Sequence, residues 1–151
     1  MPSSTLSGGD TIIINGRVFA DLATGNCVEL EYPNDIAAVK TGKNGNSLYA
    51  LNETGRQCNV KVSVLRGSSD DKFLLGLLNG LKNDFAGFVL MNGTFIKKLG
   101  DGTGVKSSDT YIMSGGIFTK NIPAVMNVEG DTNQSLAVYA MTFSNAPRVL
   151  S

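Results

Sequence analysis

The sequence contains no histidine and no tryptophan among its 151 residues, and only 17% of its residues are charged. The absence of histidine removes the side chain that most often transfers protons near neutral pH, which is also the commonest metal ligand. The 13 basic and 13 acidic residues cancel, whereas a nucleic-acid-binding protein needs a surplus of cations to displace counterions from phosphates. The composition therefore argues against most enzymes and nucleic-acid-binding proteins, and it favours a structural protein.

Cysteine is scarce as well. Cys27 and Cys58 are the two cysteines, and they cannot make a four-ligand zinc site without histidine or form a disulfide scaffold by themselves. We expect two free thiols, as is usual in a reducing compartment. The N-terminus lacks the basic and apolar segments of a signal peptide, and no run reaches the roughly 18 apolar residues of a membrane span. These absences predict a soluble chain made in a cytoplasm, with no metal, no cofactor and no membrane partner.

Hydrophobic residues make up 42% of the chain, which is enough for one core. We therefore expect a single domain over residues 1–151. Residues 1–9 and 144–151 are small or polar for the most part, and we expect them to form flexible N-terminal and C-terminal arms.

Turn signals and alternating segments dominate the first half of the chain. Asn15-Gly16 lies between the apolar runs Thr11–Ile14 and Arg17–Ala20, which is a strong hairpin signal. The segment Cys27–Tyr32 alternates, so that Glu29 and Glu31 share one face of a strand and Val28, Leu30 and Tyr32 share the other. Two further strands, Ile36–Lys40 and Leu48–Leu51, flank a polar stretch that we expect to protrude as a hairpin loop: Lys40, Thr41, Gly42, Lys43, Asn44, Gly45, Asn46 and Ser47.

The second half contains the longest alternating segment, Gln57–Arg66, and then a change of period. Helical spacing of Phe73, Leu74, Leu77, Leu78 and Leu81 after Ser68 predicts a helix with an apolar core face, whose first turn holds Asp70 and Asp71. The remaining predicted strands are Phe88–Met91, Thr94–Leu99 after a second hairpin turn at Asn92-Gly93, Tyr111–Thr119 and Ser135–Phe143. This order predicts a mainly β (α+β) fold with one helix, and the ten-residue segment Gln57–Arg66 suits a large curved sheet or barrel.

No motif in the chain carries a recognisable chemistry. The glycine-rich segment Gly100–Ser107 fails as a phosphate loop, because Val105 separates glycine from lysine and no strand-to-helix junction surrounds it. The pair Glu29 and Glu31 has no nucleophile or oxyanion partner, and Asp70 and Asp71 are explained by the helix start. We expect no catalytic residues and no enzymatic activity.

The order of elements resembles the tail tube proteins of long-tailed bacteriophages, especially the small single-domain ones of contractile-tailed phages. The resemblance rests on the early hairpin Thr11–Ala20, the strand Val28–Glu31, the loop Lys40–Ser47, and the strand Asn59–Arg66 followed by the leucine-rich helix. It extends from about Thr11 to Phe143.

The resemblance implies an antiparallel β-sandwich or barrel with one flanking helix, of which six copies form a ring with a continuous β-barrel lumen. Stacked rings would form the inner tail tube of the virion, assembled in the host bacterial cytoplasm, which conducts DNA and a tape-measure protein while a sheath contracts outside. Baseplate and tail terminator proteins would bind its two ends. The loop Lys40–Ser47 would reach an adjacent ring, and the two arms would lie against neighbouring subunits. Glu29 and Glu31 are the candidates for the lumen wall, since carboxylates repel phosphates and favour sliding of DNA.

Two alternatives remain open at this stage. The chain could be the tube protein of a related contractile injection system, such as a type VI secretion apparatus or a tailocin, in which the fold is shared and the cargo differs. It could also be a decoration or carbohydrate-binding β-sandwich of a virion, although aromatic residues for sugar stacking make up only 7% of the chain.

Overall fold

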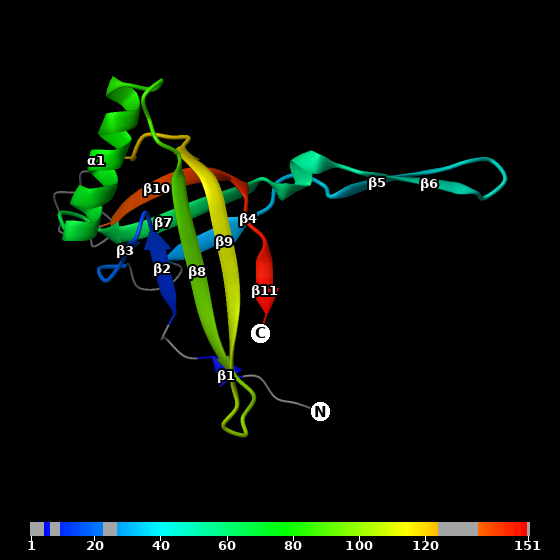
Figure 1. Cartoon of the computed structure of the whole chain (residues 1–151), viewed down its shortest axis with the longest axis horizontal. Coiled ribbons are helices and arrows are strands. Elements are labelled where there is room, and N and C mark those ends of the chain that lie inside the picture. Colours follow the sequence, from blue (N-terminus) through cyan, green and yellow to red (C-terminus); the bar gives the residue numbers. More distant parts are fainter. Residues whose placement is uncertain (1–4, 7–9, 23–26, 124–135, 151) are drawn as a thin grey trace, which may run out of the picture.

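The structure is a computed structural model that describes residues 5–6, 10–22, 27–123 and 136–150 (Figure 1). Within these ranges the protein is mainly β with one α-helix, and its paired strands are antiparallel, as the sequence predicts. The helix is α1 (Ser69–Asn83), and a 3₁₀ turn, η1, covers Glu53–Arg56. The strands are β1 (Thr5–Leu6), β2 (Thr11–Ile14), β3 (Arg17–Val18), β4 (Val28–Glu31), β5 (Ala37–Thr41), β6 (Ser47–Leu51), β7 (Cys58–Leu65), β8 (Met91–Gly100), β9 (Lys106–Phe118), β10 (Leu136–Asn145) and β11 (Arg148–Leu150).

One large sheet forms the body of the molecule, with the strand order β3-β2-β8-β9-β10-β7-β4. The short strands β1 and β11 add to β8 and β9. In Figure 1, β2, β8 and β9 run across the direction of β10, β7 and β4, so the sheet curves strongly around its core. Strand β9 joins the two halves, because it pairs with β8 along its length and with β10 near its C-terminal end.

The core lies on the inner face of this curved sheet and under α1. Buried residues alternate with more exposed residues along β7 and β10, so every second side chain of these strands points into the core. The helix adds the face that its spacing predicts, because Leu74, Leu78 and Leu81 are buried and Phe73 and Leu77 pack beside them. The buried residues of β7 and β10 are Cys58, Val60, Val62, Val64, Ala137, Tyr139, Met141 and Phe143.

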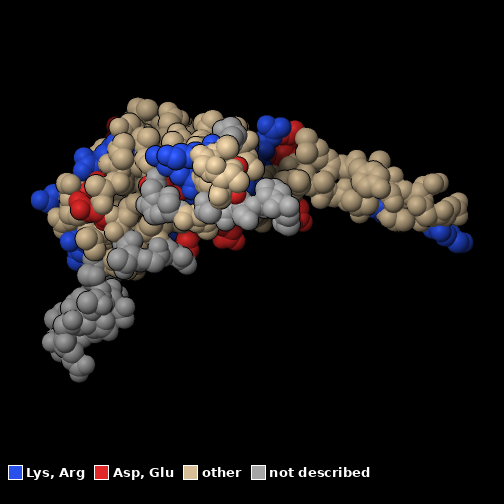
Figure 2. Space-filling model, turned by 90° about the horizontal axis from the view of Figure 1, so that it is seen from below, with Lys and Arg blue, Asp and Glu red and all other residues tan. Residues whose placement is uncertain are grey.

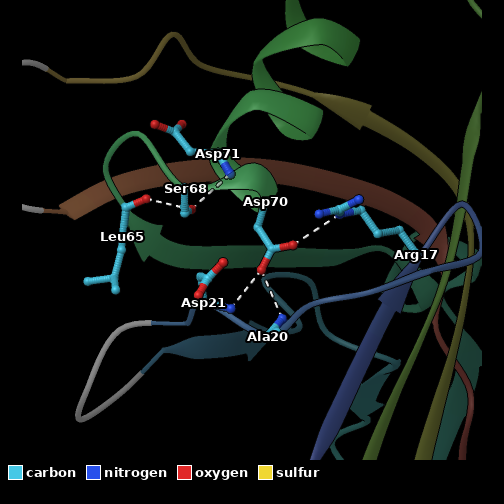
Figure 3. A network of polar contacts seen from close by, with 7 residues as sticks. All are labelled: Arg17, Ala20, Asp21, Leu65, Ser68, Asp70 and Asp71. Atoms are coloured by element: carbon cyan, nitrogen blue, oxygen red, sulfur yellow. Dashed lines mark hydrogen bonds and ion pairs between the residues drawn. The ribbon is translucent and has the colours of Figure 1, made fainter.

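The start of α1 anchors the segment that follows β3. The Ser68 hydroxyl accepts a hydrogen bond from the Asp71 N–H at 3.2 Å, which makes Ser68 the N-cap. The buried Asp70 carboxylate accepts hydrogen bonds from Arg17 Nε at 3.0 Å and from the N–H groups of Ala20 and Asp21 at 2.8 and 2.7 Å (Figure 3). Burial alone would raise the pKa of Asp70, but these backbone and guanidinium donors outweigh it and lower the pKa.

The two predicted asparagine–glycine turns have different outcomes. The turn at Asn15-Gly16 is confirmed, since both residues have positive φ and join β2 to β3. The turn at Asn92-Gly93 is wrong, because both residues lie inside β8, next to a shift in its register with β9. Glycine fits closely at position 93, because a Cβ there would lie 3.0 Å from the Ile13 carbonyl oxygen of β2.

The C-terminal residues also differ from the prediction of an arm over residues 144–151. Strand β10 continues to Asn145, and β11 pairs with Asp109–Tyr111 of β9. The Arg148 guanidinium donates to both oxygens of the buried Asp109 carboxylate, at 2.7 and 2.9 Å. Of the predicted N-terminal arm, residues 5–6 pair with β8 as β1, and the other residues up to 9 lie outside the described ranges.

A glycine pair in β9 allows β10 to approach closely. A Cβ at Gly116 would collide with the ring of Phe143, which is fully buried on the neighbouring strand. We expect Gly116→Val to lower the free energy of unfolding by about 2–3 kcal/mol, as overpacking of a closed core does, measured by urea denaturation. Gly76→Ala is the matched control: Gly76 is exposed on α1 with open space around it, so alanine should raise stability by about 0.5–1 kcal/mol. A Gly116→Val variant as stable as wild type would contradict this packing.

Candidate functional site

The most unusual feature of the molecule is a projecting hairpin, which consists of β5, β6 and the turn between them (residues 37–51). It forms a separate two-stranded sheet and extends away from the body (Figure 1). Five residue pairs hold it in register, from Ala37 opposite Leu51 to Thr41 opposite Ser47. The predicted protruding hairpin is therefore confirmed, with Lys40 and Thr41 inside β5 and Ser47 inside β6.

The turn of the hairpin is closed by its own backbone. The Gly42 N–H donates to the Asn46 carbonyl at 2.8 Å, and the Gly45 N–H donates to the Gly42 carbonyl at 3.0 Å. Gly45 has a φ of 87°, a conformation that glycine adopts without steric cost. The hydroxyls of Thr41 and Ser47 lie 2.9 Å apart just before the turn. Lys40 and Lys43 are the charged residues in this part of the hairpin.

The base of the hairpin is tightly packed, in contrast to its strands. The Asn52 N–H donates to the Ile36 carbonyl at 2.8 Å, and η1 follows at once. Gly55 of η1 packs against the backbone of residues 35 and 36, and a Cβ at Gly55 would come within 2.7 Å of the Ile36 Cα. The Asn34 amide donates to the Thr54 carbonyl at 3.1 Å. These contacts set the direction in which the hairpin leaves the body.

Both faces of the projecting hairpin present apolar side chains to solvent. Tyr49 is 73% exposed and Leu48 is 71% exposed, and Ile36, Val39 and Leu51 are also among the exposed large hydrophobic residues. The register places Val39 opposite Tyr49 on one face and Leu48 on the other face. An isolated two-stranded hairpin is marginally stable in water, and a contiguous apolar surface of this kind is typical of a protein–protein contact. Figure 2 shows the hairpin as a largely uncharged surface with cations at its far end.

The second candidate surface is the outward face of β4, β7 and β10. Glu29 and Glu31 are exposed there, while Val28 and Leu30 pack against the core, as the alternation predicts. The face forms a concavity of about 800 Å³. Its polar and small lining residues include Glu29, Glu31, Asn59, Lys61, Thr119, Lys120, Ala140 and Thr142.

The charges of this outward face are balanced. Register places Glu29 opposite Lys61 and Glu31 opposite Asn59, and Lys120 lines the same concavity. The sequence prediction named the two carboxylates and missed both lysines. Alternation within Gln57–Arg66 was the available signal for Lys61, because it puts Asn59, Lys61 and Ser63 on the face away from the core. The structure does not bring this face together with the turn of the projecting hairpin, which lies at the far end of the hairpin (Figure 1).

The buried and half-buried polar groups have structural partners. Asp70 and Asp109 are paired with Arg17 and Arg148. The Tyr32 hydroxyl donates to the Ala146 carbonyl at 2.6 Å, and burial raises the pKa of Tyr32 to about 12. In the described part of the chain, no three His, Cys, Asp or Glu side chains are grouped as a metal site requires. No described helix is long and apolar enough to cross a membrane.

The two cysteines are free in the structure. Cys58 is fully buried in β7 and Cys27 is half-buried before β4. Burial raises the pKa of the Cys58 thiol, so its reactive thiolate form is suppressed. Both cysteines therefore fit a role in packing.

The sequence matches no protein-family model and no curated protein sequence. What the chain does must therefore be inferred from the geometry of the projecting hairpin and of the outward sheet face.

Proposed function

We propose that this chain is the subunit of the inner tail tube of a contractile-tailed bacteriophage, in which six copies form a ring and rings stack into a tube. The observation that carries this proposal is the projecting hairpin. Its apolar side chains, Tyr49 and Leu48 foremost, are exposed on a two-stranded sheet that is separate from the main sheet of the body. Such a segment is stabilised when it is buried against another copy.

The edges of the main sheet support assembly as well. Strand β4 is the last strand of the sheet on one side and β3 on the other. An edge strand presents unpaired backbone groups that can pair with another chain, and pairing of edges between six copies would close the sheets into a barrel without edges. Glu29 and Glu31 lie on β4, and such charges on an edge strand disfavour indiscriminate pairing.

The outward face of β4, β7 and β10 is the proposed lumen wall. It is polar and its charges are balanced, with Glu29 opposite Lys61. A wall without a surplus of cations does not hold phosphates, which suits a conduit through which DNA slides. The wall contributes no covalent chemistry in this proposal.

Negative-stain electron microscopy of the purified full chain tests the proposal. We expect six-fold rings or hollow tubes, and a near-atomic cryo-electron microscopy reconstruction of the tubes should place Glu29 and Glu31 on the inner surface. A protein that stays monomeric at high concentration would refute the tube proposal. Tubes with both carboxylates on the outer surface would refute the assignment of the lumen.

Reversal of the two lumen charges has a specific expected effect. Glu29→Lys combined with Glu31→Lys changes the charge of one face by four per chain, from two negative charges to two positive ones, so tubes assembled with short DNA should retain it inside at low salt, and Glu29→Lys alone should have the same effect in weaker form. The measurement is the amount of DNA protected from a nuclease. The control is Asn79→Lys combined with Asn83→Lys, which adds two positive charges at exposed positions of α1 away from the proposed lumen and is compared with Glu29→Lys alone, which changes the charge by the same amount. Equal protection by both variants would count against a lumen at β4.

A further inference from the structure

A second exposed apolar surface lies at the opposite end of the molecule from the projecting hairpin. It surrounds a groove between the C-terminal half of α1 and the segment 84–92, which we call the helix groove. Val89 is 82% exposed and Phe85 is 70% exposed, and Leu90 is also exposed. In Figure 1, α1 and the projecting hairpin lie at opposite ends of the long axis.

The helix groove has a volume of about 440 Å³, within the range of about 300–1,000 Å³ that is typical of binding pockets. Gly76 and Gly80 lie one helical turn apart on α1 and line it. A Cβ at either glycine would meet no atom within 4 Å, so the floor of the groove is open backbone. Leu77, Phe88, Val89 and Leu90 provide the apolar part of the lining.

We infer that the helix groove receives the projecting hairpin of a second copy of this chain, in the adjacent ring. This inference rests on the proposed tube assembly and names the surface that the hairpin contacts. The chemistry of the two surfaces matches. Residues 36–52 include five exposed large apolar side chains, two lysines and no acidic residue, and the helix groove offers apolar walls together with Asp84. Asp84 is the C-cap of α1, where the helix dipole adds partial negative charge that favours a cation.

The concavity on the outward face of β4, β7 and β10 fits the hairpin poorly. Its lining includes four charged residues, Glu29, Glu31, Lys61 and Lys120, and these would lose hydration against Tyr49 and Leu48 without gaining partners. The apolar content of the helix groove therefore selects it as the receiving surface.

Geometry makes this contact intermolecular. The packing of Gly55 against Ile36 and the hydrogen bond from Asn52 to Ile36 hold the hairpin directed away from the body, so the hairpin cannot reach the helix groove of its own chain. A contact between two different surfaces at opposite ends is heterologous, and such contacts propagate from copy to copy unless their rotation closes a ring. Continued stacking of rings requires a heterologous contact that does not close.

Photo-cross-linking tests the inference directly. p-Benzoylphenylalanine replaces Tyr49 in the full chain, assembled samples are irradiated, and cross-linked tryptic peptides are identified by mass spectrometry. We expect the partner peptide to be residues 83–97, which lies between Lys82 and Lys97 and contains segment 84–92 of the groove. The same probe at Val105, which is 63% exposed in the β8–β9 loop, should not label this peptide.

A substitution in the groove provides the second measurement. Val89→Asp should raise the protein concentration needed for assembly by about tenfold or more, which equals about 1.4 kcal/mol per contact, whereas Val89→Ile should assemble as wild type. Circular dichroism should show both variants folded, since Val89 makes little contact with the core. Tubes that form normally with Val89→Asp, or cross-links to other peptides, would overturn this inference and leave the tube proposal standing. The absence of any assembly by the wild-type chain would overturn both.

Discussion

A variant in which Asn-Gly replaces residues 37–51 is expected to fold as a monomer and to lose assembly completely. The Asn52 N–H donates to the Ile36 carbonyl at 2.8 Å, which is the hydrogen bond that closes a two-residue turn, so Asn-Gly can join these two residues as Asn15-Gly16 joins β2 and β3. The deleted residues contribute nothing to the core. The free energy of unfolding should therefore stay within about 0.5 kcal/mol of wild type, while sedimentation and electron microscopy should show that rings and tubes are absent.

Val105→Ser is the control for loss of exposed apolar surface in general, and it should assemble normally. A shortened chain that still forms tubes would refute the role given to the projecting hairpin. A shortened chain that is strongly destabilised would instead show that the hairpin stabilises its own subunit, which is contrary to the geometry described above.

The second large effect is expected from Asp70→Ala. This substitution removes a buried carboxylate and leaves Arg17 Nε and the N–H groups of Ala20 and Asp21 without their acceptor. Loss of one partner of such a buried network costs about 3 kcal/mol, to be measured by urea denaturation at pH 7. Asp21→Asn is the control, because Asp21 contributes its backbone N–H to this network and asparagine retains that group (Figure 3).

The effect of Asp70→Ala should depend on pH in a defined direction. The folded state lowers the pKa of Asp70 below its ordinary value of 3.8, so the stabilisation by the carboxylate is fully present above about pH 4 and is lost as the pH falls through the folded-state pKa. The difference in stability between wild type and Asp70→Ala should thus be constant from pH 7 to pH 5 and shrink towards pH 3. A difference that does not change with pH would show that the charge of Asp70 is not what stabilises this junction.

Local patterns in the sequence predicted the elements whose geometry depends on neighbouring residues. Alternation predicted which faces of β4 and β7 are buried, and spacing predicted the core face of α1. The asparagine–glycine turn signal was correct at Asn15-Gly16 but wrong at Asn92-Gly93. At the second position the backbone lies close to β2, and this distant neighbour keeps the dipeptide within a strand. Strand β11 was missed for a related reason: three residues are too short to show a period, and their partner is the distant strand β9.

The candidate site was predicted in outline. The polar residues between two short strands predicted a protruding hairpin. They did not predict that the two strands would also extend away from the body. The exposure of Leu48 and Tyr49 depends on where every other element packs, and this packing cannot be read from the local sequence. The partners of Glu29 and Glu31 depend on strand order, which brings Lys61 from β7 and Lys120 from beyond β9 to the same concavity. The sequence alone contained no signal that α1 and segment 84–92 would form a groove.

The packing of Gly55 against Ile36 has a mechanical consequence for any assembly built from this chain. The five residue pairs of the hairpin span about 17 Å, and the contact of Gly55 with Ile36 lies at the base of this length. A rotation of the hairpin by about 10° at its base would displace the far end by about 3 Å. This displacement is enough to separate a side chain at the far end from a binding partner. In an assembled tube, the stiffness of the contacts at the base of the hairpin would thus set the tolerance with which successive copies are aligned.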